Sequence, residues 1–186
     1  MAMVTQVAGR TGKRAHGLLR RVLMCFSFTR KKVSFFRVAS QGRSSEELIS
    51  GKKSSGCFVN DWARGVMNSP AFITTDGRNY KSVIIRGDEF EDDDRSTWRI
   101  REKALKLGYR TPLAEVAPLL EEQVTDQDIR EMDLWGLVVM HEPILVGGHP
   151  FLLSFRKEPR FFGVSRGTPH ALWSRRLGFV FLAPTE

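Results

Sequence analysis

The chain has 186 residues, 41% of them hydrophobic, and a formal net charge of +8. This length suffices for one ordinary hydrophobic core and is short for two, so one domain with a tail is expected. No apolar run reaches the roughly 18 to 20 residues that a membrane-spanning helix needs, which excludes a spanning segment.

The positive charge is concentrated in the first third of the chain. Residues 1–64 contain 13 Lys or Arg and three acids, whereas residues 67–186 contain 16 bases and 18 acids. We therefore expect a basic segment of irregular structure over residues 1–66 and a single folded domain over residues 67–186. Both cysteines precede this domain, which therefore contains no disulfide and no thiolate metal site.

Three interpretations fit the basic segment, residues 1–66. It is a stretch translated upstream of a true start at Met67, a targeting or disordered tail, or a basic arm that binds nucleic acid. The first is favoured, since codons for Arg64-Gly65-Val66 resemble a bacterial ribosome-binding site. The expected location is the cytoplasm, or an organelle matrix if residues 1–45 are a transit peptide.

The first half of the expected domain contains one hairpin and three helix signals. Beta-prone runs on both sides of Asp76-Gly77 predict a hairpin over residues 72–85. Ser96 as a cap and Gly108 as a terminator predict a helix from about residue 97 to 107. Two further short helices are predicted. One starts at Thr111-Pro112 and is interrupted at Pro118, and the other is capped by Thr125 and Asp128.

Strand signals dominate from residue 134 onward. Residues 135–140 are apolar on both faces, which predicts a buried central strand. Gly147-Gly148 predicts the turn of a second hairpin, and residues 161–164 and 179–182 predict two more strands. The order predicts an α+β fold: a mostly antiparallel sheet of four to six strands with two or three short helices on one face.

The C-terminal strands combine bases with aromatic residues. From residue 143 to 186, six bases face two acids. Such a surface can bind single-stranded nucleic acid, because cations follow phosphates and rings stack on bases. Simple alternation along strands produces the same pattern without a ligand. The candidate residues are Arg156, Lys157, Arg160, Arg166, Trp173, Arg175 and Arg176.

Two other sites compete with the basic strands. The acidic loop over residues 88–94, with Asp92, Asp93 and Asp94, could bind a basic protein partner. His141, Glu142 and His149 would form the site of a metal-dependent hydrolase if the second hairpin brought them together.

The chain contains no established metal, cofactor or nucleophile motif in a supporting context, so no cofactor, metal or catalytic residue is expected. The leading hypothesis is a small non-enzymatic accessory protein of the kind that phages and plasmids carry. It would bind a charged macromolecule, with nucleic acid favoured over a protein partner.

Overall fold

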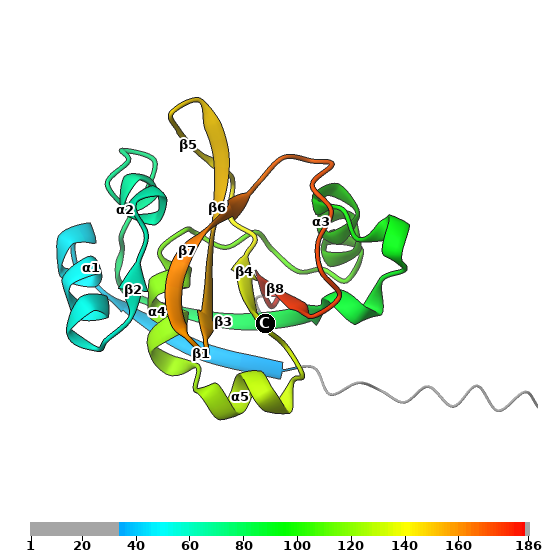
Figure 1. Ribbon diagram of the computed structural model, residues 1–186, viewed down its shortest axis with the longest axis horizontal. Helices are drawn as coiled ribbons and strands as arrows, with labels where there is room; N and C mark the ends of the chain where they lie inside the picture. The colour runs from blue at the N-terminus through cyan, green and yellow to red at the C-terminus, as the bar shows by residue number, and fades with distance from the viewer. Residues whose placement is uncertain (1–33, 185–186) are drawn as a thin grey trace, which may run out of the picture. The chain divides into compact units, whose positions relative to one another are not determined.

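The computed structural model describes residues 34–184, which form an α+β fold around one eight-stranded sheet (Figure 1). In spatial order the strands are β1-β3-β8-β4-β6-β7-β2, and β5 pairs with β6 beside this path. The strands are β1 (Ser34–Gln41), β2 (Phe58–Val59), β3 (Asp76–Arg86), β4 (Gly136–Val139), β5 (Ile144–Val146), β6 (His149–Lys157), β7 (Arg160–Arg166) and β8 (Leu177–Leu182). The helices are α1 (Ser45–Ser54), α2 (Asp61–Met67), α3 (Thr97–Lys106), α4 (Val116–Gln123) and α5 (Asp126–Glu131), with short 3-10 turns at Gly87–Glu89 and Asp92–Asp94.

The sheet is mixed but mostly antiparallel. The pairs β4–β8 and β2–β7 are parallel, and the other pairs are antiparallel. The predicted fold class and the mostly antiparallel character are therefore confirmed. The expected four to six strands were too few, because the sheet also recruits strands from before residue 67.

Residues 34–66 belong to the fold, so the expected boundary at Met67 is wrong for this stretch. Strand β1 pairs with β3 from Ser34↔Ile84 onward, and side chains such as Val38 and Leu48 lie in the main core. Helix α1 begins with a capping box in which Ser44 and Glu47 satisfy each other's backbone N–H groups. The predictions for residues 1–33 lie outside the described residues.

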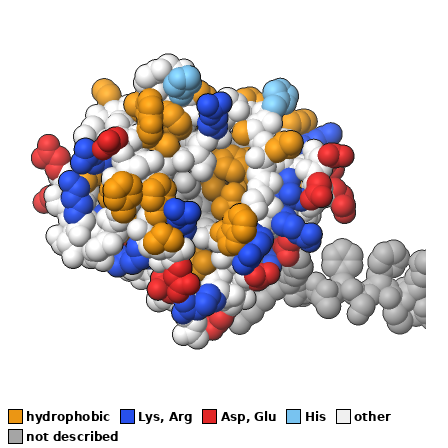
Figure 2. Space-filling model, viewed as in Figure 1, with side chains coloured by type: hydrophobic (Ala, Val, Ile, Leu, Met, Phe, Trp, Pro, Cys, Tyr) orange, Lys and Arg blue, Asp and Glu red, His pale blue; other side chains and the backbone are white. Residues whose placement is uncertain are grey.

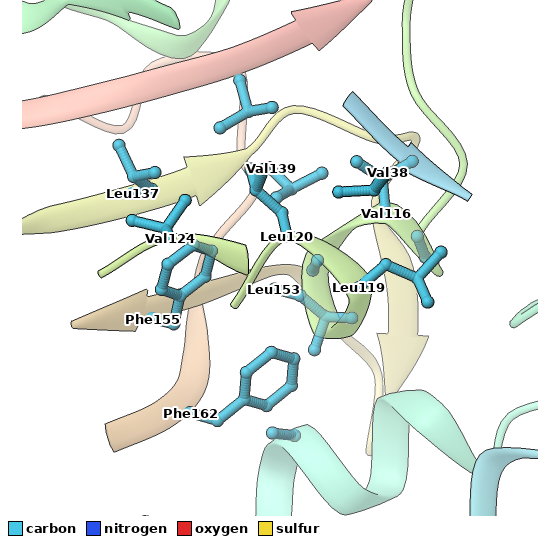
Figure 3. Close-up of a cluster of buried hydrophobic side chains, with 14 of the residues drawn as sticks. Val38, Val116, Leu119, Leu120, Val124, Leu137, Val139, Leu153, Phe155 and Phe162 are labelled. Carbon is cyan, nitrogen blue, oxygen red and sulfur yellow. The ribbon is translucent and has the colours of Figure 1, made fainter. Parts of the chain in front are cut away.

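Helices cover both faces of the sheet, not the single face expected. The larger cluster of buried side chains includes residues of α1, α2, α4 and α5. Figure 3 labels the part of it in which Leu119 and Leu120 of α4 lie among strand residues such as Phe155. The second cluster joins Ile100 and Ala104 of α3 to Val83, Ile85 and Phe179 on the opposite face. Two hydrophobic layers therefore hold the sheet between them. Among residues 34–184, no helix is both long and apolar enough to cross a membrane.

The sequence correctly predicted local features of single elements: where helices begin and end, and one hairpin turn. Ser96 caps α3 by accepting from the Arg99 N–H, and Gly108 follows the helix with φ +76°. Thr125 and Asp128 form the capping box of α5. The turn of the β5–β6 hairpin has positive φ at both Gly147 and Gly148, as predicted.

Two of the predicted elements differ from the structure. Residues 76–86 form one strand, β3, that pairs with β1, so the hairpin expected around Asp76-Gly77 is absent. The helix expected at Pro112 begins only at Val116. Pro118 is then in the first turn of α4, where a missing N–H leaves no helical hydrogen bond unmade.

Candidate nucleic-acid interface

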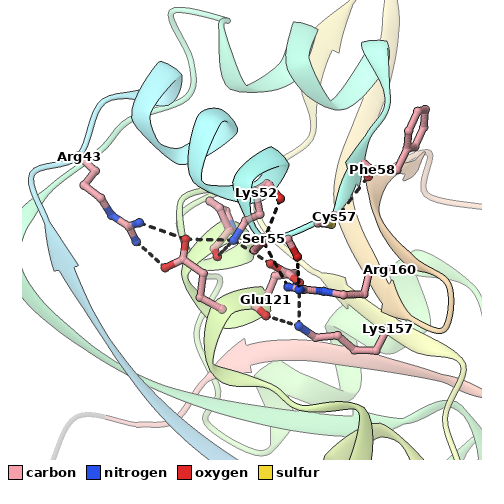
Figure 4. A network of polar contacts seen from close by, with 10 residues as sticks. Arg43, Lys52, Ser55, Cys57, Phe58, Glu121, Lys157 and Arg160 are labelled. Atoms are coloured by element: carbon pink, nitrogen blue, oxygen red, sulfur yellow. Dashed lines mark hydrogen bonds and ion pairs between the residues drawn. The ribbon is translucent and has the colours of Figure 1, made fainter.

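Two of the predicted nucleic-acid-binding residues take part in a buried ionic network (Figure 4). Lys157 is 5% exposed, and its ammonium lies 2.7 Å from Glu121 Oε1. Arg160 donates to the same carboxylate at 3.1 Å and to the backbone oxygen of Ser55 at 2.5 Å. Both cations therefore make contacts within the protein. Lys157 is buried by them and does not lie on a ligand surface, whereas the side chain of Arg160 remains 35% exposed.

The network centres on Glu121 of α4 and Lys52 of α1, both fully buried. Their charged atoms are 2.9 Å apart, and Lys52 also donates to the Pro118 carbonyl at 2.5 Å. Burial alone would raise the pKa of Glu121, but the charge of Lys52 and the hydrogen bond from Lys157 outweigh it and lower the pKa to about 2. The network therefore ties α1 to α4 and to the end of β6.

Trp173 packs against the protein and does not stand free for stacking. Its indole N–H donates to Thr97 Oγ1 at 3.0 Å, and its ring meets Phe179 edge-on with centroids 5.8 Å apart. Arg166 and Arg175 are exposed, as a binding role would require. Trp173, the aromatic residue predicted for the site, therefore packs within the protein.

A row of aromatic and arginine side chains crosses neighbouring strands at one end of the sheet; all are exposed except Phe161, which is half-buried. Phe58 of β2 pairs with Phe161 of β7, which pairs with Arg156 of β6. The rings of Phe58 and Phe161 stack at 5.8 Å, and the Arg156 guanidinium lies 4.8 Å from the Phe161 ring centroid. Phe58 is 63% exposed.

The next strands extend the row. The pairing of Leu137 with Phe155 brings Gly136 opposite Arg156, and a Cβ at Gly136 would come within 2.5 Å of a backbone oxygen of β6. Trp135 precedes this glycine and is 57% exposed. The guanidinium of Arg176 lies 5.0 Å from the ring centroid of Trp135.

We call Phe58, Phe161, Arg156, Trp135 and Arg176 the aromatic–arginine row. Five adjacent strands or strand ends contribute to it, which at a spacing of about 4.8 Å spans roughly 19 Å. Trp135, Arg156 and Arg176 also line a groove of about 510 Å³, together with Arg130 of α5. Figure 2 shows hydrophobic and basic side chains side by side over the part of the molecule where Figure 1 places β7.

The predicted acidic loop is exposed but bound to the protein. Asp92 pairs with the nearly buried guanidinium of Arg95, and that arginine also donates to the Gly87 and Trp173 carbonyls. Asp94 lies 3.5 Å from Arg99. Asp93 is exposed. Much of the charge expected to meet a partner is therefore compensated within the loop and α3.

The structure does not bring His141, Glu142 and His149 together as a metal site. His141 is 1% exposed, its Nε2 accepts the Leu153 N–H at 2.9 Å, and its Nδ1 bonds the Glu142 backbone oxygen at 2.6 Å. Glu142 points to Arg101, and His149 is exposed at the start of β6. Within residues 34–184, no group of three His, Cys, Asp or Glu side chains is placed to hold a metal ion.

The buried His141 makes a testable contribution to the pH dependence of stability. Burial lowers its pKa from 6.5 to about 4, so between these values the unfolded chain binds more protons than the folded protein. The contribution of His141 to the free energy of unfolding is therefore fully present above pH 6.5. It is lost as the pH drops toward 4, by roughly 3 kcal/mol in total. Urea unfolding at pH 7 and pH 5 should show about 2 kcal/mol of this loss, and His141→Gln should reduce it. A wild-type midpoint that is identical at both pH values would contradict this assignment.

Sequence reasoning missed Phe58, Trp135 and Lys52. Phe58 and Lys52 fall within residues 1–66, for which irregular structure was predicted. The pair Ser44 and Glu47 in this segment nevertheless matches the capping-box pattern of a helix start. Trp135 was assigned to the buried strand because its neighbours are apolar. Nothing in the local sequence separates it from the fully buried residues of β4.

Comparison of the chain with protein-family models, with curated proteins and with solved structures found no match.

Proposed function

We propose that this protein is a non-enzymatic binding protein that takes up single-stranded nucleic acid on the aromatic–arginine row. The proposal is supported above all by the succession of aromatic rings and guanidinium groups across neighbouring strands, in which the rings of Phe58 and Trp135 are exposed. Two arginines lie over two of the rings, at 4.8 Å and 5.0 Å. An exposed aromatic ring offers a stacking surface to any base, while a neighbouring arginine can reach the adjoining phosphate.

A single strand fits this surface better than a duplex. Bases in a duplex are already stacked on one another, whereas those of a single strand can lie on protein rings. Phe58, Phe161 and Arg156 are direct partners across β2, β7 and β6, so these three side chains share one face of the sheet. The ligand would therefore run across the strands from β2 toward β8.

The charge at the row predicts modest affinity and a measurable dependence on salt. Arg130 and Arg176 are partly compensated, by Glu158 and by Asp133 at 3.3 Å. If Arg130, Arg156 and Arg176 each contact one phosphate, the logarithm of the binding constant should fall against the logarithm of salt concentration with a slope of about −2.

The chain contains a matched control for the row. Arg99 lies 5.3 Å from the ring centroid of Trp98 on α3, and Arg176 lies 5.0 Å from that of Trp135. Each arginine also pairs with an acid. The side chains of Arg99 and Arg176 are 48% and 47% exposed. Equal substitutions in the two pairs therefore separate a specific effect from the general loss of an exposed aromatic residue or a positive charge.

We expect Trp135→Ala to weaken binding of a fluorescent single-stranded oligonucleotide by about 1–3 kcal/mol, because one stacked base is lost. Arg176→Gln should weaken binding and change the salt slope by about 0.7. Fluorescence anisotropy at several salt concentrations measures both effects. Trp98→Ala and Arg99→Gln should leave affinity and slope unchanged.

Two results would overturn the proposal. One is the absence of salt-sensitive binding of single-stranded DNA and RNA by the full chain at low ionic strength. The other is an equal loss of affinity in the Trp98 and Trp135 variants, since that would place the ligand elsewhere or make its binding unspecific.

A further inference from the structure

A second cavity lies on the α3 side of the sheet and is independent of the aromatic–arginine row. Its volume is about 470 Å³, which is within the range of small-molecule sites. Helix α3 and the segments around Pro143 and Gly167 contribute to its wall. Most of the lining is apolar and comprises Trp98, Ala104, Leu105, Pro143, Pro169 and Phe181.

The cavity has one prominent cation, Arg101, whose side chain is only 20% exposed. Its guanidinium donates to the carboxylate of Glu142 at 3.2 Å and to the backbone oxygen of His141. Burial lowers the pKa of Arg101, because the charged form loses hydration. A positive charge held in an apolar cavity favours a compact anion as its partner.

Glu142 shows which anion suits this position. The carboxylate of Glu142 already accepts a hydrogen bond from one terminal nitrogen of the Arg101 guanidinium. The side chain of Glu142 is nevertheless 80% exposed. A side chain this exposed can rotate into solvent at little cost, since water replaces its ion pair. The other acid of the wall, Glu102, is bound to Arg99 and Lys106 and does not compete for Arg101.

We propose that this cavity binds a small amphipathic monocarboxylate, with its carboxylate on Arg101 in place of Glu142 and its apolar body against Phe181 and Leu105. The volume and lining select the apolar body, and the buried guanidinium selects the carboxylate. Glu142 then acts as an internal competitor that the ligand displaces.

The test compares octanoate with octan-1-ol, which have the same apolar body with and without the carboxylate. Isothermal titration calorimetry on the full chain should show one octanoate site and at least about tenfold weaker binding of octanol, as expected for loss of a charged hydrogen bond. Arg101→Gln should weaken octanoate binding by a similar factor, and Arg101→Lys should restore part of it. Glu142→Ala should strengthen octanoate binding, whereas a merely structural ion pair would not produce this gain.

Lys103→Gln serves as the control, because Lys103 is a cation of the same helix that pairs with Glu89, and both residues lie outside the cavity wall. Its octanoate affinity should match that of the wild type. Equal binding of octanoate and octanol, no octanoate binding, or unchanged affinity in a folded Arg101→Gln protein would overturn the proposal. Circular dichroism establishes that each variant is folded, so a loss of binding is not confused with unfolding.

Discussion

A protein that begins at Met67 will fail to fold. Removing residues 34–66 strips β1 from β3 and deletes buried side chains of the main core, among them Val38, Leu48, Ile49 and Val66. Burial of such side chains contributes roughly 1.5–3 kcal/mol each, so the combined loss is on the order of 10 kcal/mol. This equals or exceeds the stability of a typical domain.

The measurement is thermal unfolding followed by circular dichroism for three chains, residues 1–186, 34–186 and 67–186. The first two should unfold cooperatively, because both contain β1 and the buried side chains of residues 34–66. The third should show no cooperative transition. A cooperative transition of 67–186 near that of the full chain would mean that the first four elements are dispensable.

The second large effect is expected from Glu121. Glu121→Gln removes the only acid that is fully buried among the cations Lys52, Lys157 and Arg160 in the described network. Leaving buried cations uncompensated costs about 3–5 kcal/mol. We expect the free energy of unfolding in urea at pH 7 to fall by this amount.

The adjacent residue provides the control for this variant. Glu122 is 34% exposed and pairs with Arg43 at 2.6 Å and with Lys52 at 3.1 Å, so Glu122→Gln should cost less than Glu121→Gln, because Lys52 keeps its fully buried partner Glu121. The difference between wild type and Glu121→Gln should also shrink on acidification. A carboxylate whose pKa is lowered to about 2 contributes stability above its ordinary pKa of 4.5, and this contribution is lost as the pH falls toward 2. Equal losses in the two variants would contradict a buried network centred on Glu121.

The sequence predicted those parts of the fold that depend on a few neighbouring residues. Caps at Ser96 and Thr125 and the turn at Gly147-Gly148 need only local hydrogen bonds and positive φ angles. The first hairpin failed for the opposite reason. Gly77 does adopt φ +64°, but the strand continues, because its partner β1 comes from earlier in the chain.

The candidate site was only partly predictable. Alternation along β6 correctly exposes Arg156 and turns Phe155 inward, but it cannot reveal that Lys157 meets Glu121 of α4. That contact depends on how the helix packs on the sheet. The row itself depends on strand register across β2, β7, β6 and β4, and two of its aromatic residues lie in segments whose pairing the sequence does not disclose.

Charge composition was misleading about the expected domain boundary at Met67. The excess of bases before residue 67 suggested a segment outside the fold, whereas Lys52 is fully buried and Arg43 pairs with Glu122. A basic composition over a window therefore does not exclude burial when acids from a distant helix compensate the charges.

Photocrosslinking tests the proposed role of the row most directly. The full chain is irradiated with single-stranded DNA or RNA carrying 5-bromouracil, and the modified peptides are identified by mass spectrometry. Crosslinks should fall on Phe58, Trp135 or Phe161. Crosslinks confined to other segments, such as the α3 peptide that carries Trp98, would contradict binding at the aromatic–arginine row.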